Sequence, residues 1–549
     1  MSSLDAGPDP HAPPLSSERR KRLVLLAAIM GSSVVALDAT VVSVALPAIR
    51  RDLGGGLAGQ QWISTGYLLA LGSLILIGGS LGDVFGERRV FSIGVAGFGL
   101  VSALCSAAPN IDLLIGARVL QGVFGALLTP SALAVIVAAF PVRERGVAIG
   151  SWTAWSSIAT VLGPLLGGYL VTVASWRLIF ALNAPLAALT LLLVLRAVPA
   201  RGASEARVEV DWFGGALALF GLAGVLVALI REPSAGWASA AVAGSGLAGL
   251  ALLAGFVGHE RRAEHPMLPL ELFKRRNFAV GNAQTFVMYC GFGVVFFFVV
   301  LFLQQVAGYS ALQAGLAILP ASVIMFVFSK RVGRLADRFG AHLFIGLGPL
   351  VAAVGLFLLT KLEVPFDYAT DLLPGWLLLS CGLTATFAPL TATVLASADE
   401  SNAGIASGVN NAISRVSWLL GVAVVGAVMA SVFGSTLDNR LEGVNVPRAA
   451  HAALVQARRQ TLTHVDPADV GVPAAAAVSS ASVHAFHVGM EIAAGLVACG
   501  GIMGLIAFRR PRRRVRAEDC AAAQFVAQPL DAAQEYPPRN TAIDELAPT

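Results

Sequence analysis

The stretch Gly79-Ser-Leu-Gly-Asp83-Val-Phe-Gly86-Glu-Arg88-Arg89 lies between two long apolar segments of the chain. A second copy, Gly333-Arg-Leu-Ala-Asp337-Arg338-Phe-Gly340, begins 254 positions later (333 − 79) and also separates two apolar segments. Both copies fit the frame G-x-L-[GA]-D-x-F-G. A repeated loop in a repeated hydropathy context predicts two related halves, which is an architecture found in transporters.

The composition is that of a membrane protein. Of 549 residues, 56% are hydrophobic and only 13% are charged, and the mean hydropathy is +0.75. A helix needs about 20 mostly apolar residues to cross a bilayer, and many such runs are present. The predicted spans are fourteen: residues 24–46, 60–81, 90–108, 111–138, 147–171, 177–196, 211–231, 237–257, 278–304, 312–330, 342–361, 373–397, 405–434 and 484–507.

A second echo supports the division into halves. Gly146-Val-Ala-Ile-Gly150 matches Gly404-Ile-Ala-Ser-Gly408 at an offset of 258 (404 − 146), in the same order as the first repeat. We therefore expect an all-α protein with two six-helix bundles and two inserted helices. The predicted parts are a cytoplasmic N-terminal segment (1–23), a first bundle (24–196), inserted helices with connectors (197–277), a second bundle (278–507) with a long outer loop near 435–483, and a disordered cytoplasmic tail (508–549).

The charged residues predict the orientation in the plasma membrane. With fourteen spans and an inner N-terminus, 27 of the 38 Lys and Arg residues fall in cytoplasmic segments. Cytoplasmic segments of membrane proteins carry this excess, so both termini are expected inside. The basic residues are scattered between spans, which argues against nucleic-acid binding. The five cysteines show no spacing typical of a disulfide or a metal site.

Asp38 lies well inside the first apolar run. An ionised carboxylate is costly there, so such a residue by default marks a transport pathway or a coupling site. We expect Asp38 to exchange a proton. The alternative is a structural acid paired with an arginine or a helix dipole.

The fourth predicted helix carries Arg118, Gln121, Gly125 and Thr129 at steps of three and four residues, which places them on one inward face. An intramembrane arginine can sense the protonation of a nearby acid or only brace the bundle, and both interpretations stay open.

The fifth predicted helix is rich in glycine. Gly163 and Gly167 form a GxxxG pattern that permits close helix contact, although such a pattern more often reflects plain packing. Pro164 removes one backbone donor and can kink the helix. The adjacent proline and Gly168 make the combination more specific than GxxxG alone.

The second bundle combines amides with aromatic residues on its first helix, which is typical of an apolar binding cavity with a few polar groups. Core packing or contact with lipid would give the same pattern. The residues assigned to a substrate cavity are Trp62, Tyr67, Gln121, Asn282, Phe286, Asn410, Asn411 and Arg415. His484 and His487, near the outer end of the last helix, are expected to be structural groups.

These motifs resemble the major facilitator superfamily, and within it the fourteen-helix drug:proton antiporters. The loop at Gly79, the fourth-helix run from Arg118 to Pro130, the glycines of the fifth helix and the run from Leu37 to Pro47 carry the resemblance, which extends over most of residues 24–507. Departures from the family pattern are Ser43, Val84, Glu87, Phe124 and Ala159. Val84 and Glu87 put the strength of the charged loop contact in doubt.

The resemblance implies roles for specific residues. Asp38 and Arg118 would couple transport to protons, and the fifth-helix residues would mark an antiporter. The implied antiporter residues are Gly150, Gly163, Pro164, Gly167 and Gly168. The two loops would gate the conformational change through Gly79, Asp83, Gly86 and Arg88 and through Gly333, Asp337, Arg338 and Gly340.

The sequence therefore predicts a monomeric, proton-coupled efflux transporter for lipophilic, preferentially cationic drugs or antibiotics. No G-x-x-x-x-G-K-[ST] pattern is present, so we expect the proton motive force rather than ATP to drive it, without a cofactor. No nucleophile–base or metal constellation marks an enzyme. The alternatives are an exporter or importer of one metabolite, such as a siderophore, sugar or peptide, and a receptor that kept the fold without transport.

Overall fold

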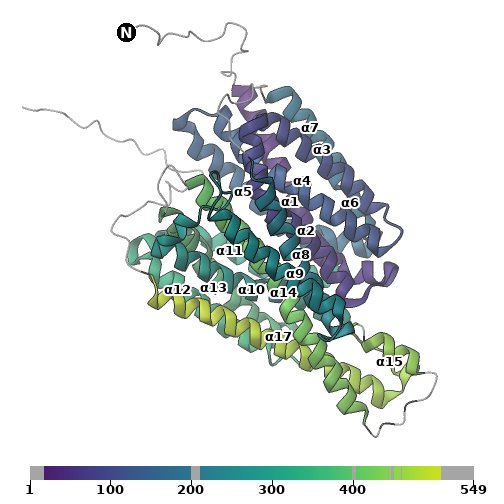
Figure 1. The fold of residues 1–549 in the computed structure, drawn as a ribbon. Helices are drawn as coiled ribbons and strands as arrows, with labels where there is room; N and C mark the ends of the chain where they lie inside the picture. The colour runs from purple at the N-terminus through teal and green to yellow at the C-terminus, as the bar shows by residue number, and fades with distance from the viewer. Residues whose placement is uncertain are drawn as a thin grey trace, which may run out of the picture.

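The computed structural model describes residues 18–198, 210–397, 403–442, 444, 446, 450–458 and 460–508. Within these ranges the chain forms helices and no strand (Figure 1). The predicted N-terminal residues 1–17, the connector 199–209 and the tail beyond 508 lie outside the described residues. The helices are α1 (Glu18–Leu53), α2 (Gly56–Phe85), α3 (Glu87–Ser106), α4 (Ile111–Ala139), α5 (Val142–Val173), α6 (Arg177–Ala181), α7 (Asn183–Ala197), α8 (Trp212–Ala235), α9 (Ala240–Glu260), η1 (Leu270–Lys274), α10 (Arg276–Gln305), α11 (Ala311–Phe339), α12 (Ala341–Leu359), η2 (Tyr368–Leu372), α13 (Leu373–Ala396), α14 (Ala403–Leu441), α15 (His451–Arg458), α16 (Pro467–Val470) and α17 (Val472–Ile506).

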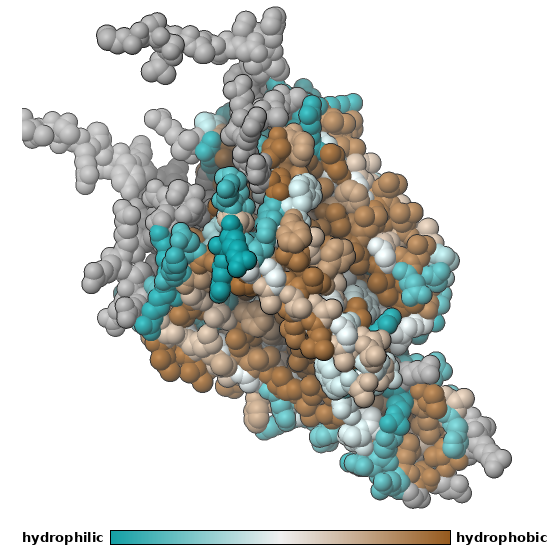
Figure 2. All heavy atoms as spheres, viewed as in Figure 1, coloured by the Kyte–Doolittle hydropathy of each residue, from teal (hydrophilic) through white to brown (hydrophobic). Residues whose placement is uncertain are grey.

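Fourteen of these segments are long and apolar enough to cross a membrane, which confirms the predicted spans. The sixth span combines α6 with α7, and the twelfth combines η2 with α13. Hydrophobic side chains cover much of the flank in Figure 2, and hydrophilic ones gather toward the two ends. We call the end that holds residues 18 and 508 the terminal end, and the opposite end, which holds α15, the loop end (Figure 1).

Glycines bring the helices of the first bundle together. A Cβ at Gly78 of α2 would overlap the Ala126 carbonyl of α4, and one at Gly122 of α4 would overlap the Tyr67 carbonyl of α2. Only residues without a side chain allow such a backbone approach, and it compensates for the absence of a hydrophobic driving force within lipid. The α2–α4 pair is therefore fixed tightly along its length.

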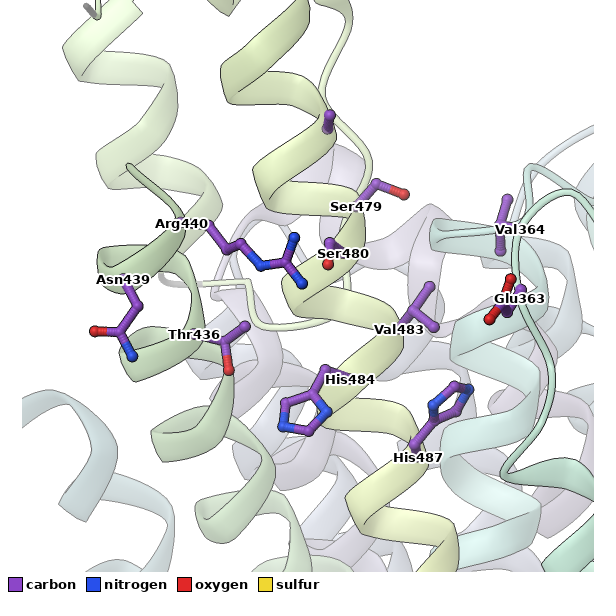
Figure 3. Close-up of a pocket in the computed structure, with 11 residues that line it drawn as sticks. Glu363, Val364, Thr436, Asn439, Arg440, Ser479, Ser480, Val483, His484 and His487 are labelled. Atoms are coloured by element: carbon purple, nitrogen blue, oxygen red, sulfur yellow. The ribbon is translucent and has the colours of Figure 1, made fainter. Parts of the chain in front are cut away.

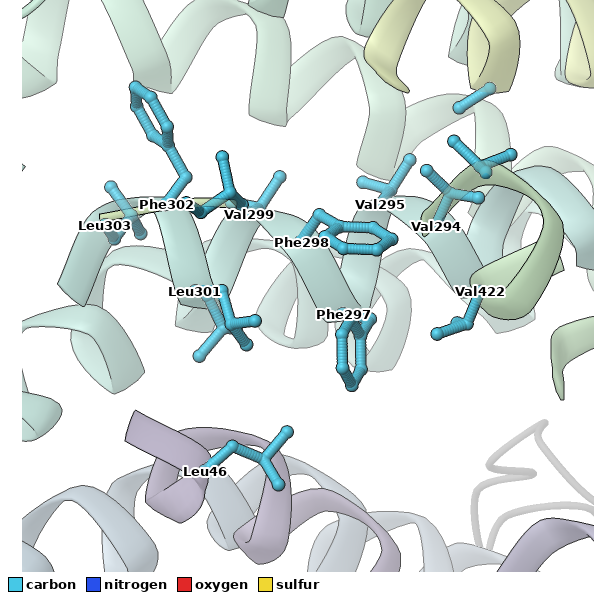
Figure 4. Close-up of a cluster of buried hydrophobic side chains, with 14 of the residues drawn as sticks. Leu46, Val294, Val295, Phe297, Phe298, Val299, Leu301, Phe302, Leu303 and Val422 are labelled. Atoms are coloured by element: carbon cyan, nitrogen blue, oxygen red, sulfur yellow. The ribbon is translucent and has the colours of Figure 1, made fainter. Parts of the chain in front are cut away.

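Helix α10 forms the centre of the second bundle. Most of its side chains from Phe292 to Leu303 are buried, and the Phe302 ring stacks on Phe486 of α17 with centroids 4.0 Å apart. In Figure 4, Phe297 and Leu301 of α10 point toward Leu46 of α1, so this core continues into the first bundle.

The inserted helices α8 and α9 pack against each other through small residues. A Cβ at Gly224 would lie 2.7 Å from the Ser245 carbonyl oxygen, and one at Gly249 would lie 2.7 Å from the Gly221 carbonyl oxygen. Helix α8 also contacts α2 and α14, so the pair covers one flank of the seam between the bundles.

The loop near 435–483 was predicted too long. Helix α14 continues to Leu441 and α17 begins at Val472, and α15 and α16 lie between them. The 39 residues of α14 span roughly 58 Å, about twice the hydrocarbon thickness of a bilayer. The extensions were missed because residues 435–441 of α14 are polar and the first turns of α17 are rich in Ala and Ser, so both are less apolar than the membrane-depth turns.

The two copies of the repeated loop have the same backbone geometry. Gly86 ends α2 with φ +88° and donates its N–H to the Gly82 carbonyl at 2.9 Å. Gly340 ends α11 with φ +97° and donates its N–H to the Ala336 carbonyl at 2.8 Å. Both positions need glycine because this backbone region disfavours a Cβ. The repeat is thus a shared helix-ending turn.

The described contacts between α5 of the first bundle and α11 of the second lie toward the loop end. A Cβ at Gly168 would lie 2.7 Å from the Ala311 carbonyl oxygen, and one at Gly315 would lie 2.5 Å from the Pro164 carbonyl oxygen. At the same end, Gln304 donates to the Val44 carbonyl at 2.9 Å. Helices α2 and α14 add a further seam, where Gln61 donates to the Val422 carbonyl at 3.0 Å.

Candidate functional site

Asp38 lies at the centre of a buried polar network in the first bundle. Its Oδ2 accepts from Arg118 at 2.5 Å, and its Oδ1 accepts from Gln121 at 3.0 Å and from Asn183 at 2.9 Å. Both Asp38 and Arg118 are only 1% exposed. Helices α1, α4 and α7 each contribute one part of the network, which no local sequence window could show.

Arg118 has further partners beyond the carboxylate. It donates through Nε to the Ile63 carbonyl at 3.1 Å and through Nη1 to the Gln121 side-chain oxygen at 2.6 Å. Its guanidinium lies 4.2 Å from the centroid of the Tyr67 ring and 5.6 Å from that of Phe180. Breaking a buried ion pair by removing one partner costs about 3–5 kcal/mol, so either residue depends strongly on the other.

Gln121 belongs to this network rather than to an open surface. Its amide donates to Asp38 and, at 2.7 Å, to the Ser102 hydroxyl of α3, while its oxygen accepts from Arg118. The assignment of Gln121 to a substrate cavity is therefore wrong in this structure, because its hydrogen-bonding groups are already occupied.

The glycines of α5 fit α1 closely beside Asp38. A Cβ at Gly163 would overlap the Thr40 hydroxyl, and one at Gly167 would lie 3.0 Å from the Val41 carbonyl oxygen. Gly168 and Pro164 lie against α11 of the other bundle. Helix α5 thus touches both the helix that carries Asp38 and the opposite bundle. Gly150 lies nearer the terminal end and is half-buried.

Among the described side chains, the loop residues predicted to gate the movement form no charge network with one another. Asp83 is exposed and makes no hydrogen bond or ion pair with a described residue, and Arg88 donates to the Leu195 carbonyl at 2.9 Å. A Cβ at Gly79 would make an ordinary contact with Pro130.

In the second copy of the loop, the described side chains also make few contacts. A Cβ at Gly333 would meet nothing within 4 Å, and Arg338 lies over the Phe339 ring. The side chain of Asp337 lies outside the described residues.

Three more residues assigned to the substrate cavity need correction. Trp62 packs among apolar side chains at the junction of α2, α8 and α14, because the inserted helix covers that face. Asn282 and Asn410 are buried and bond to each other at 3.1 Å, so they join α10 to α14 inside the second bundle. Asn411 is half-buried and donates to the Ser407 carbonyl, and Phe286 is 40% exposed.

Tyr67 of α2 and Arg415 of α14 lie on opposite sides of the seam between the bundles. Gly72 of α2 faces the Arg415 side chain of α14, with 3.2 Å from a Cβ at Gly72 to the Arg415 Cβ. Tyr67 and Tyr289 lie within electrostatic range of Arg415. The Tyr67 hydroxyl and the Arg415 Nε are buried and lack a hydrogen-bond partner among the described residues.

Aromatic rings extend this region within the second bundle. Tyr289 contacts Phe387 with centroids 5.5 Å apart, and Phe296 stacks on Trp418 at 5.8 Å. All four rings are half-buried. The interleaving of aromatic and amide residues on α10 had pointed to Tyr289 and Phe296. Phe387 and Trp418 carry no such signal, and neither does Ser102, because their neighbours come from other helices.

A separate cavity of about 770 Å³ opens at the loop end, between α14, α17 and the segment after α12 (Figure 3). Arg440 and Thr436 point toward α17 there, opposite His484 and Glu363 (Figure 3). The His487 ring lies 2.6 Å from the Leu362 carbonyl oxygen, which agrees with a structural role. Among the described residues no group of three or more His, Cys, Asp or Glu side chains could hold a metal ion.

Comparison with known proteins agrees with this architecture. The sequence model described as Major Facilitator Superfamily matches residues 28–422. The chain is 34% identical over 462 residues to a tetracenomycin C resistance and export protein of Streptomyces glaucescens, covering 84% of each chain. It is 36% identical over 431 residues to a puromycin resistance protein of Streptomyces alboniger, covering 78% of this chain and 84% of the relative.

A multidrug resistance protein of Mycobacterium tuberculosis is 35% identical over 428 residues, covering 77% of this chain and 79% of the relative. Among solved structures, a bacterial homologue of the human lysosomal transporter Spinster, in an inward-facing and unoccupied conformation, superposes with a TM-score of 0.61. That match has 16% sequence identity and covers 90% of this chain and 98% of the other, so it shows a shared fold.

Proposed function

Because the chain belongs to the major facilitator superfamily, a family of membrane transporters, we propose that it exports lipophilic drugs or antibiotics in exchange for protons. The observation that carries the proposal is the Asp38–Arg118 pair, an ion pair buried in the first bundle of a multi-pass membrane protein. Relatives named for resistance and export support efflux as the direction. One chain holds both bundles and is the proposed transport unit.

We place the terminal end in the cytoplasm, as the distribution of Lys and Arg predicts. The contacts of α5 with α11 near Gly168 and Gly315 would then close the outer side. We propose that the state in which these contacts are closed is the one that admits substrate from the cytoplasm. Alternating access then requires these contacts to open.

Protonation of Asp38 supplies the driving change. The carboxylate has three side-chain donors, and its charge balances that of Arg118. When Asp38 takes a proton, Arg118 is left as a buried charge without a counterion, which is strongly unfavourable. The helices α1 and α4 must then adjust, so the two protonation states favour different conformations.

Helix α5 provides a route from Asp38 to the other bundle. Gly163 contacts α1 at Thr40, two positions after Asp38, and Gly168 contacts α11. Both contacts are made by glycines, which have no side chain that could adjust. A shift of α1 would therefore move α5 and, with it, the contact between α5 and α11. One proton moving down about 150 mV releases roughly 3.5 kcal/mol, enough for a substrate gradient of several hundredfold.

The repeated loops fit a latch for the opposite state. Asp83 has no partner among the described residues, and Arg88 is bonded within its own bundle. We propose that the cytoplasmic ends approach when the outer side opens, and that Asp83 then finds a basic partner. The free carboxylate in this state is what that cycle requires.

The test uses inverted membrane vesicles from cells with and without the protein. A growth-inhibition panel of toxic compounds first identifies one to which expression gives resistance. An imposed acid interior should then drive uptake of that compound, and collapse of the pH gradient by nigericin should abolish it. Uptake that continues undiminished without the gradient would contradict proton coupling, and a panel without any protected compound would contradict drug efflux.

A further inference from the structure

We propose that the substrate is a flat aromatic molecule that carries an anionic group, bound between the aromatic rings of the second bundle and Arg415. This inference rests on the proposed function, because it takes the seam between the bundles as the transport route. It departs from the preference for cations that the sequence predicted.

Arg415 lies at mid-depth of the molecule and has no counterion among the described residues. It lies 12 residues after the start of α14, about 18 Å along the helix from the terminal end. It forms no ion pair or hydrogen bond with a described residue, and its Nε is buried without a partner. Arginines inside a membrane protein normally pair with an acid or backbone carbonyls, so this one has capacity for a ligand.

The helices around Arg415 offer no carboxylate at that depth. The only acid on α2 is Asp83, near its end, and α10 and α13 contain none. On α14 the only acid is Asp438, 23 positions away (438 − 415), and Glu491 of α17 is exposed. Asp38 already balances Arg118. The centre of the molecule therefore has an excess positive charge, which attracts an anion and repels a cation.

The neighbouring groups suit an aromatic ligand. Trp418 follows Arg415 by three positions, so the two share one face of α14. The Trp418 ring stacks on Phe296, and Tyr289 contacts Phe387 and lies within electrostatic range of Arg415. These rings are half-buried, which leaves surface for stacking. The unpartnered Tyr67 hydroxyl adds a donor from the first bundle.

Tyr67 also links this region to the proton site. Arg118 lies 4.2 Å from the centroid of its ring, and Arg415 lies within electrostatic range of it on the other side of the seam. An anion that binds Arg415 and Tyr67 would therefore contact both bundles at once. Such a ligand distinguishes the two conformations by its contacts, as a coupled substrate must.

The experiment uses three fluorescent probes with the same ring system: anthracene-9-carboxylate (anionic), anthracene-9-carboxamide (neutral) and 9-(aminomethyl)anthracene (cationic). Binding to the purified protein is followed by energy transfer from tryptophan. We expect the anion to bind about tenfold or more tighter than the amide, the scale of a charge-assisted bond, and the cation to bind weakest. Arg415→Gln should make the affinities for the three probes similar. Arg415→Lys should keep the same ranking of affinities with smaller differences between them.

The control variant is Arg231→Gln, which removes one exposed positive charge at the loop end of α8 and should leave the order unchanged. Arg440→Gln tests the cavity at the loop end as a rival anion site. Equal binding of the three probes to the wild type, or a charge preference that survives Arg415→Gln or disappears in Arg440→Gln, would overturn the proposal. The titration needs no proton gradient, so failure of gradient-driven uptake would contradict the proposed function and leave this result standing.

Discussion

The two bundles hold their central arginines in opposite ways. Arg118 of the first bundle has a carboxylate, an amide, a backbone carbonyl and an aromatic ring around it. Arg415 of the second bundle has an unpartnered Nε beside half-buried aromatic rings. An arginine paired with a carboxylate suits a site that holds and releases a proton. An arginine with an unused hydrogen-bond donor suits a site that binds a ligand. The two bundles thus surround their central arginines with different chemical groups.

The largest expected effect is a difference in the free energy of unfolding between variants of the two arginines. Arg118→Gln leaves Asp38 as a buried carboxylate without its cation and should lower the free energy of unfolding by about 3–5 kcal/mol. Arg415→Gln breaks no described ion pair and should change it by less than about 0.5 kcal/mol or raise it. Thermal unfolding of the purified variants in detergent measures both.

The double variant Asp38→Asn/Arg118→Gln is the control for the first change. It removes both charges and should recover part of the loss. If Arg118→Gln and Arg415→Gln were equally destabilising, the contrast between a paired and an unpaired centre would be wrong.

A smaller effect compares two asparagines. Asn183 donates to the Asp38 carboxylate, and hydrogen bonds to charged groups contribute about 1.5–3 kcal/mol, so Asn183→Ala should destabilise by that amount. Asn411→Ala removes only a bond to the Ser407 carbonyl on its own helix and should cost about 1 kcal/mol or less. Chemical denaturation in mixed micelles would measure the difference, and equal costs would show that Asp38 does not depend on Asn183.

The contact between α5 and α11, which joins the two bundles toward the loop end, gives the next prediction. Gly168→Leu places a side chain against the Ala311 backbone and should shift the population away from the state closed at the loop end by about tenfold. Spin labels at Val173 and Leu316, both exposed, should report a longer distance. Gly495→Ala, where a Cβ meets nothing within 4 Å, is the matched control. An unchanged distance in Gly168→Leu would exclude this seam as the outer gate.

The smallest effect concerns the repeated loop. Asp83 is exposed and makes no ion pair with a described residue in this state, so Asp83→Asn should leave the stability of this state unchanged and weaken only the opposite state. A surface pair contributes about 0.2–1 kcal/mol, which predicts a several-fold rise in the population open at the terminal end. The same spin-label pair would show it. A population identical to that of the wild type would exclude the latch.

The spans and the duplicated organisation could be predicted from the sequence, because the length of an apolar run and a repeated glycine frame are local signals. Gly86 and Gly340 illustrate this, since both end a helix with the same positive φ. Asp38 and Arg118 could also be identified, because a charge within an apolar run is conspicuous by itself.

The partners of these residues could not be predicted. Asn183 and Ser102 reach Asp38 and Gln121 from α7 and α3, and nothing in the local pattern distinguishes them from packing residues. Trp62 was misassigned because the inserted helix α8 covers its face, which the sequence of α2 cannot show. The extent of α14 and α17 beyond the membrane was missed because hydropathy identifies spans rather than helices.

The central claim is that Asp38 carries the coupled proton, and one comparison in inverted vesicles tests it most directly. The compound identified by the resistance panel is followed in two assays, accumulation driven by a pH gradient and exchange of labelled for unlabelled compound without a gradient. Asp38→Asn should abolish accumulation and retain exchange, because the neutral amide still allows the bundles to move but binds no proton. Accumulation by Asp38→Asn equal to that of the wild type would contradict the account.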